Sequence, residues 1–136
     1  MSIRSALLFC LLCDLCVLCG ESFSAPPQVT YFYPAGARRG TAVEVTAGGT
    51  FERWPVQVWA SDKAITSTAT KDKGKLSISV AADAVPGVYW LRLYDAQGAS
   101  FLRPFVVGTL PEVIEKEPND EPAKAQAVAA PAVVNG

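Results

Sequence analysis

The chain of 136 residues carries 12 lysines and arginines against 13 aspartates and glutamates, which gives a net charge of −1 at pH 7. This near-neutral balance gives no electrostatic reason to expect a nucleic-acid partner. The sequence contains no histidine, which excludes Ser-His-Asp and Cys-His catalytic arrangements. A pair of carboxylates remains formally open as a catalytic group. Scattered acidic residues are more typical of a solvated surface, however, and we expect the chain itself not to be an enzyme.

The first 24 residues have the three-part pattern of a secretory signal peptide. Arg4 gives the positive start, and residues 6–20 form an apolar run that is too short for an ordinary membrane-spanning helix. Ser22-Phe23-Ser24 then places small residues where a signal peptidase cuts. We predict a signal peptide over residues 1–24, with a membrane-retained anchor as the alternative. Arg4, Asp14 and Glu21 leave with it, so the remaining chain has no net charge.

All the cysteines lie inside this predicted signal peptide. They stand three apart, at Cys10, Cys13, Cys16 and Cys19. A bacterial iron–sulfur motif has a similar start, but there the fourth cysteine comes one residue later and a proline follows it. Free cysteine behaves as a small hydrophobe, so an apolar run can hold four of them. Without histidine or a later cysteine, the rest of the chain has no ordinary zinc or copper ligands and no disulfide.

Short alternating runs separated by turn residues fill the sequence between residues 29 and 107. The predicted strands are 29–33, 41–47, 55–60, 65–70, 75–80, 87–95 and 100–107. About seven strands at this spacing, with no helical period, predict an all-β fold: an immunoglobulin-like β-sandwich over residues 25–108. The polar run 65–70 is predicted at a sheet edge, and the run 87–95, which is apolar on both faces, is predicted to be central.

Turn residues set the predicted boundaries of these strands. The segment 34–40 is predicted to be a loop, and Gly48-Gly49 is predicted to end the second strand. Pro104 predicts that the last strand lies at an edge or carries a bulge, because proline cannot donate to a ladder.

The start of this region resembles an IPT/TIG domain. Such domains open with a proline, a strand, a Pro-x-Gly loop, a second glycine, an alternating strand and a glycine before a phenylalanine. The matching residues here are Pro27, Pro34, Gly36, Gly40, Val43, Val45, Gly48, Gly49 and Phe51. The stretch GVYWLRLYDAQGASFLRPFVVG is similar to the close of many bacterial immunoglobulin-like modules. The resemblance implies a spacer or binding module of an extracellular protein.

The composition changes after Gly108, and residues 109–136 are rich in proline and acidic residues. A polar linker is one interpretation. The stretch EKEPNDEPAKAQAVAAPAVVNG also closely resembles the start of a bacterial pre-peptidase C-terminal (PPC) domain. Asn135-Gly136 is a hairpin signal. We therefore expect the chain to be an N-terminal piece of a longer exported protein, with a linker and a truncated PPC-like domain over residues 109–136.

An acidic segment within this region is a candidate calcium site. Collagen-binding domains related to the PPC family use a similar segment as part of a calcium site. That resemblance implies four candidate ligands, Glu115, Glu117, Asn119 and Asp120. Carboxylate and amide oxygens are the ligands that calcium prefers. The alternative is a solvated acidic linker.

Aromatic and basic residues of the sandwich are candidates for a ligand surface. Trp54, Trp59, Trp90 and the tyrosines could stack on sugars, with Trp54 and Trp90 as the chosen ligand-surface residues, although such residues more often pack in the core or at an edge. Arg38 and Arg39 in the first loop could bind an anion, and a solvated loop is the alternative.

From these features we expect a non-catalytic module for extracellular binding, adhesion or spacing within a larger exported protein. One alternative is the accessory N-terminal region of a secreted peptidase or other hydrolase, since PPC domains often accompany such enzymes. A second alternative is a stand-alone carbohydrate-binding module. The expected partners are an extracellular protein or polysaccharide and downstream domains of the same chain, without nucleic acid or, after signal cleavage, a membrane. The expected location is outside the cell or on its surface, or the periplasm.

Overall fold

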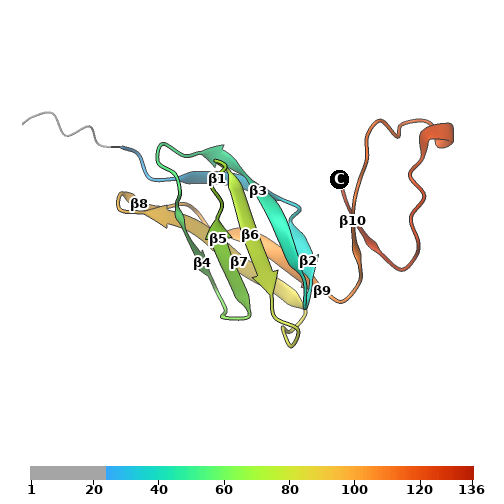
Figure 1. Ribbon diagram of the computed structural model, residues 1–136, viewed down its shortest axis with the longest axis horizontal. Coiled ribbons are helices and arrows are strands. Elements are labelled where there is room, and N and C mark those ends of the chain that lie inside the picture. The colour runs from blue at the N-terminus through green and yellow to red at the C-terminus, as the bar shows by residue number, and fades with distance from the viewer. Residues whose placement is uncertain (1–23) are drawn as a thin grey trace, which may run out of the picture.

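A computed structural model describes residues 24–136, and within them residues 28–108 form an all-β sandwich of two sheets (Figure 1). The predicted fold class is therefore confirmed. The predicted signal peptide lies, except for Ser24, outside the described residues. The first sheet has the order β1-β3-β6-β5, with bounds Gln28–Tyr33, Ala42–Thr50, Lys75–Val80 and Ile65–Ala69. The second has the order β2-β9-β7-β4, with bounds Gly36–Arg38, Arg103–Gly108, Gly87–Asp95 and Gln57–Ala60. A short strand, β8 (Gly98–Ala99), also pairs with β7.

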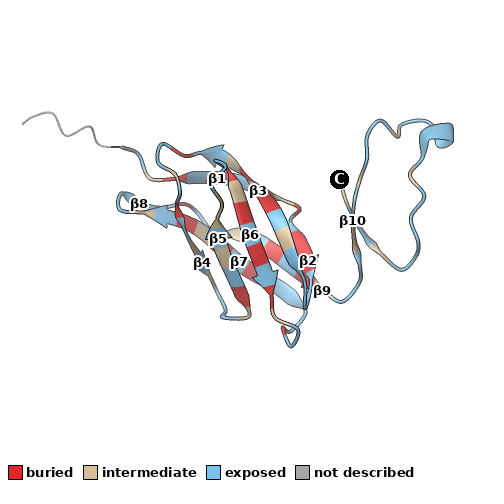
Figure 2. Ribbon diagram, in the orientation of Figure 1, coloured by how far each residue is buried: buried red, intermediate tan, exposed pale blue. Residues whose placement is uncertain are grey.

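The two sheets share one hydrophobic core between their inner faces (Figure 2). Alternation along the strands decides which side chains enter it, because successive residues point to opposite faces of a sheet. Strand β6 contributes Leu76, Ile78 and Val80, as predicted, and β7 contributes Tyr89, Leu91 and Leu93. The other buried members are Val29, Phe32, Ala37, Val45, Ala47, Phe51, Val56, Ile65, Ala84, Phe105 and Val107.

Two predictions of strand position are confirmed and two of strand boundaries are wrong. Strand β5 lies at the edge of its sheet, and β7 lies between β9 and β4. The segment 34–40 is not only a loop, because β2 within it pairs in parallel with β9. Gly48-Gly49 does not end its strand, since β3 continues to Thr50 and both glycines pair with β1. Glycine is needed there because the Tyr31 ring lies where a Cβ on Gly48 would be.

The prediction of an edge or a bulge at Pro104 is wrong for strand β9 as a whole, which lies between β2 and β7 and pairs with β7 without a shift of register. Strand β2 pairs only with residues 106–108 of β9. Pro104 pairs with Trp90 of β7 and has no partner in β2. The missing N–H of the proline therefore costs no ladder bond on the β2 side.

The residues after the sandwich form a separate pair of short strands beside it (Figure 1). Strand β10 (Glu112–Ile114) pairs in parallel with β11 (Val133–Asn135), and a single 3-10 turn, η2 (Pro122–Lys124), lies between them. The hydroxyl of Tyr33 on β1 donates to the backbone oxygen of Asn135 at 3.3 Å, which connects this pair to the sandwich. No helix in residues 24–136 has the length and apolar character needed to cross a membrane.

Candidate binding site

The four predicted calcium ligands lie in the segment that connects β10 and β11. The side-chain Nδ2 of Asn119 donates to Glu115 Oε1 at 2.7 Å, and its backbone N–H donates to Glu117 Oε2 at 3.0 Å. Calcium requires about six to eight oxygen ligands. Over the range 24–136, no three acidic, histidine or cysteine side chains gather where they could hold a metal ion. Asn119 thus donates to both glutamates in this structure, and calcium binding by the four residues stays a prediction.

Trp54 packs inside the fold instead of offering a free ring. Its indole Nε1 donates to the backbone oxygen of Thr70 at 2.7 Å. Its ring meets Phe51 edge-on, with 5.4 Å between ring centroids. A buried or half-buried tryptophan usually satisfies its N–H in this way. The structure therefore gives Trp54 a packing role and does not support its place in a ligand surface.

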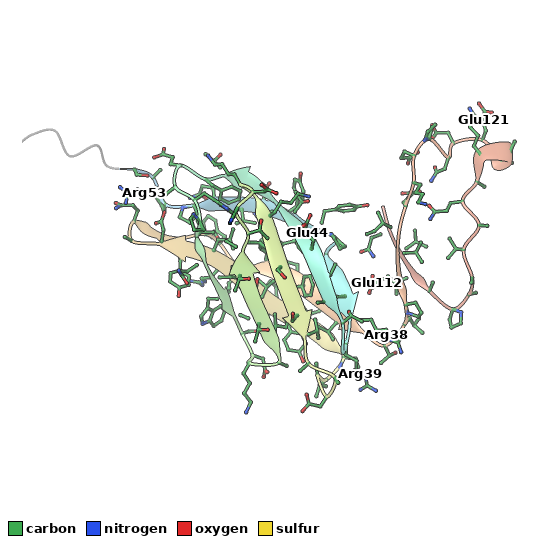
Figure 3. All side chains as sticks on the ribbon, in the orientation of Figure 1. Arg38, Arg39, Glu44, Arg53, Glu112 and Glu121 are labelled. Carbon is green, nitrogen blue, oxygen red and sulfur yellow. The ribbon has the colours of Figure 1, made fainter. Side chains whose placement is uncertain are left out.

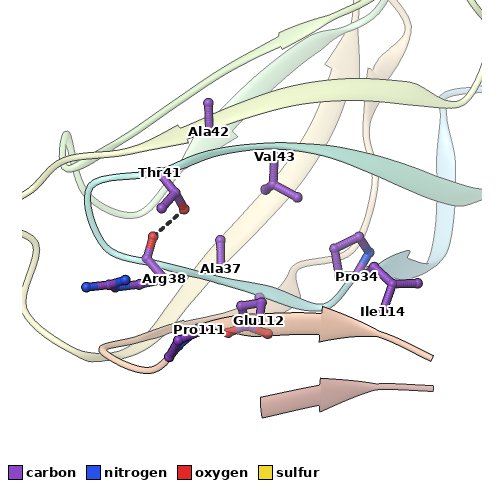
Figure 4. Close-up of a pocket in the computed structure, with 10 residues that line it drawn as sticks. Pro34, Ala37, Arg38, Thr41, Ala42, Val43, Pro111, Glu112 and Ile114 are labelled. Atoms are coloured by element: carbon purple, nitrogen blue, oxygen red, sulfur yellow. Dashed lines mark hydrogen bonds between the residues drawn. The ribbon is translucent and has the colours of Figure 1, made fainter. Parts of the chain in front are cut away.

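Arg38 and Arg39 lie at the end of the sandwich opposite Arg53 (Figure 3). Arg38 ends β2 and lines a hollow of about 360 Å³ between the sandwich and β10. Figure 4 shows this hollow, with Glu112 and Ile114 of β10 facing β2 and β3. Arg39 is not part of its lining, and its backbone N–H donates to the oxygen of Gly108. Only Arg38 of the two therefore lines this hollow, and anion binding by the pair stays a prediction.

Trp90 lies on an open face of the second sheet together with Trp59 and Tyr94, which the sequence had also named as candidates for stacking on a sugar, and with Arg92, which it had not. Inner residues of β7 are buried, so the alternate residues point outward from the sandwich. We call seven of the outward residues of β4, β7 and β9 the aromatic face: Trp59, Val88, Trp90, Arg92, Tyr94, Pro104 and Val106. The exposed fractions are 45% for Trp59, 45% for Trp90, 39% for Tyr94, 56% for Val88 and 49% for Val106.

Strand register brings these side chains together. Trp59 of β4 stands opposite Arg92 of β7, and Trp90 stands opposite Pro104 of β9. The guanidinium carbon of Arg92 lies over the Trp59 ring, 5.7 Å from its centroid, which is a cation–π contact. Trp59, Arg92 and Tyr94 also line a shallow hollow of about 530 Å³. The face thus combines three aromatic rings with one cation held in place among them.

The N-terminal residues are held on the sandwich by a carboxylate with a shifted pKa. The Ser24 hydroxyl, which lies close without full hydrogen-bond geometry, and the backbone N–H of Ala25, at 2.9 Å, keep the pKa of Glu52 below its ordinary value of 4.5. Desolvation, Arg53 and Asp95 have smaller effects on the same carboxylate. A lowered pKa means that the contact is favoured while Glu52 is ionised.

We expect residues 24 and 25 to detach from Glu52 on acidification. A group with a lowered pKa in the folded state stabilises it above the ordinary pKa, and this contribution is lost as the pH falls through the lowered value. In the uncleaved chain, where Ser24 still precedes it, the amide resonance of Ala25 should therefore shift in a titration below pH 4.5. In Glu52→Gln the amide can still be bound, but the acid step should disappear. A step of equal size in that variant would contradict the assignment.

No protein-family model matches the chain, and no curated protein matches it. The fold and this surface define the class of protein: an all-β sandwich with one open sheet face that carries aromatic rings and an arginine.

Proposed function

We propose that residues 25–108 form a non-catalytic binding module of an exported protein, and that the module binds its ligand on the aromatic face. The observation that carries this proposal is the exposure of Trp59, Trp90 and Tyr94 on one sheet face, with Arg92 among them. A contiguous exposed apolar patch on a small protein is typical of an interaction site. Tryptophan, tyrosine and arginine are also the residues that most often dominate binding energy.

The remaining parts of the proposal rest on the sequence. Export is supported by the signal-peptide pattern of residues 1–24, and the IPT/TIG-like identity by the resemblance over residues 27–108. A binding role without catalysis agrees with the lack of histidine in the whole chain. The partner classes are an extracellular protein or a polysaccharide.

The test is binding by the protein and a double variant, Trp59→Ala with Trp90→Ala, to a panel of insoluble polysaccharides and immobilised extracellular proteins. We expect at least one surface to retain the protein. The affinity of the double variant for that surface should be lower by a factor of about 100, because the loss of each central anchor costs at least ~1.4 kcal/mol of binding free energy. Tyr31→Ala is the control, since Tyr31 is 55% exposed but lies on β1 in the other sheet. Retention that is equal for all three proteins would refute the proposal.

A second candidate function is the accessory region of a secreted peptidase or other hydrolase. The observation that favours it is the motif Glu117-Pro118-Asn119-Asp120, which resembles the start of a PPC domain. The intact mass of the native exported protein tests it. A mass well above 14.4 kDa, together with hydrolase activity in the same molecule, would support this candidate. A mass below that value would speak against it.

A further inference from the structure

We propose that the aromatic face binds a polysaccharide chain that carries carboxylate groups, and that Arg92 binds the carboxylate. This inference rests on the proposed function, because it names the ligand of the same face. It is carried by the shape of the face, by the pairing of its strands and by the position of Arg92.

The rings form a strip along β7. Trp90 and Tyr94 are four residues apart on the same side of the strand, which corresponds to about 13 Å. Arg92 lies midway between them, and Trp59 stands opposite Arg92 on the neighbouring strand, about 5 Å to the side. A ligand that contacts Trp90, Tyr94 and the Arg92 guanidinium over Trp59 therefore lies lengthwise on β7. Its shape is that of an extended chain.

The size of the face disfavours a globular protein as the ligand. A stable protein–protein interface uses about 20–30 residues on each side. The aromatic face contains only the outward residues of three short strands. A slender polymer can bind to such a strip, because the few repeating units that lie on it each contact one ring or the charged group.

The pairing of β7 distinguishes a sugar chain from a peptide. Extended peptides usually bind along a sheet edge, where unpaired backbone groups accept them as a new strand. Strand β7 is paired on both sides, with β4 and β9, so its face offers no free backbone groups. A peptide lying flat on it would bury its own N–H and C=O groups without partners, which is costly. A sugar ring can place its C–H face on an aromatic ring and keep its hydroxyls at the rim, in water.

The charge of Arg92 selects for an acidic chain. Within residues 24–136 the ion pairs are Lys75–Glu44 and Lys124–Glu121, so Arg92 has no carboxylate partner there, and its guanidinium contacts the Trp59 ring. A neutral sugar chain offers this guanidinium only hydroxyl oxygens, which accept weaker hydrogen bonds than an ionised acceptor does. A carboxylate accepts two parallel hydrogen bonds from a guanidinium. Asp95, at the Tyr94 end of the strip, accepts from the backbone N–H of Gln97 and would repel a carboxylate there, which leaves Arg92 as its place.

The experiment measures the affinity of the protein for three soluble polymers by calorimetry. Polygalacturonate is the acidic probe, its methyl ester is the matched uncharged chain, and polyglutamate carries the same charge on a peptide. We expect polygalacturonate to bind at least about tenfold more tightly than the other two, since charge-assisted hydrogen bonds are the strong ones. Its affinity should fall with added salt, because salt screens the exposed pair.

Arg92→Gln should lose this preference and bind polygalacturonate and its ester alike, whereas Lys71→Gln, which removes an exposed positive charge between β5 and β6 of the other sheet, should behave as the parent protein. Trp90→Ala should weaken both sugar polymers about equally. Equal binding of polyglutamate, or an Arg92→Gln variant with the full preference for acid, would overturn the inference. If no sugar polymer binds while a protein ligand is held in a Trp90-dependent manner, the inference fails and the proposed function stands. Urea unfolding of each variant confirms that it is folded.

Discussion

Phe105→Ala is expected to lower the free energy of unfolding by about 3–5 kcal/mol, which is the range for removing a buried aromatic side chain. Phe105 is fully buried on the inner face of β9, in the core that both sheets share. The cost has two parts, the lost transfer of the ring out of water and the cavity that remains. Close-packed sheets can fill that cavity only by moving a whole strand, so we expect the upper half of the range.

A loss of this size removes much of the stability of the protein. Small domains have a free energy of unfolding near the lower end of the general range of about 5–15 kcal/mol. The sandwich has no cysteine and therefore no disulfide to offset the loss. Urea titration followed by tryptophan fluorescence measures the change as a shift of the midpoint at unchanged slope.

Val106→Ala is the matched control for this prediction. Val106 follows Phe105 on the same strand but points to the solvent and is 49% exposed. We expect its free energy of unfolding to change by less than about 0.5 kcal/mol, as for most surface substitutions. Equal losses in the two variants would contradict the inward and outward assignment along β9. They would also place the aromatic face in doubt.

The core strands could be predicted from the sequence because burial leaves a local signal. Leu76, Ile78 and Val80 alternate with polar residues, and one half-buried strand is enough to produce that pattern. Strand β2 has no such signal, since it is only three residues long and exists because β9 lies beside it. The same is true of Gly48-Gly49, where the approach of β1 turns an apparent turn into paired strand.

The aromatic face could be predicted only in part for the same reason. Trp90 and Tyr94 are an even number of residues apart on one strand, so the sequence alone predicts that they lie on the same face. Trp59 joins them through the register of β4 on β7, which pairs residues far apart in the chain. The sequence gives no signal that distinguishes Trp54 from Trp90, yet Trp54 lies outside a strand and packs on Phe51. Which tryptophan is free is decided by tertiary contacts.

Gly49→Ala is expected to have the second largest effect among the predicted changes, with a loss of more than about 2 kcal/mol in the free energy of unfolding. Gly49 has a φ of +152°, a backbone conformation that L residues with a side chain rarely adopt. It also pairs with Val29 of β1, where a Cβ would collide with the backbone oxygen of Gln28. Backbone atoms of a paired strand cannot turn away as a side chain can, so β1 has to move.

The movement of β1 would not stay local, because β1 is attached to the other sheet. The backbone oxygen of Val29 accepts a hydrogen bond from Arg103 Nε on β9 at 2.9 Å, and Val29 itself is buried in the core. A shift of Val29 therefore weakens this bond and the packing of Val29 together. Strand β1 pairs with β3, which lies inside its sheet. We therefore expect Gly49→Ala to lower the stability of the whole sandwich and not only to fray its edge.

Gly87→Ala separates the collision from the backbone strain. Gly87 has nearly the same conformation, with a φ of +157°, but nothing lies within 4 Å of the position of a Cβ there. It should lose only the strain contribution, about 1 kcal/mol. The difference between the two variants then measures how tightly β1 is held on β3. A Gly49→Ala loss no larger than that of Gly87→Ala would mean that β1 can move aside freely, and that the Val29–Arg103 bond does not hold the two sheets together.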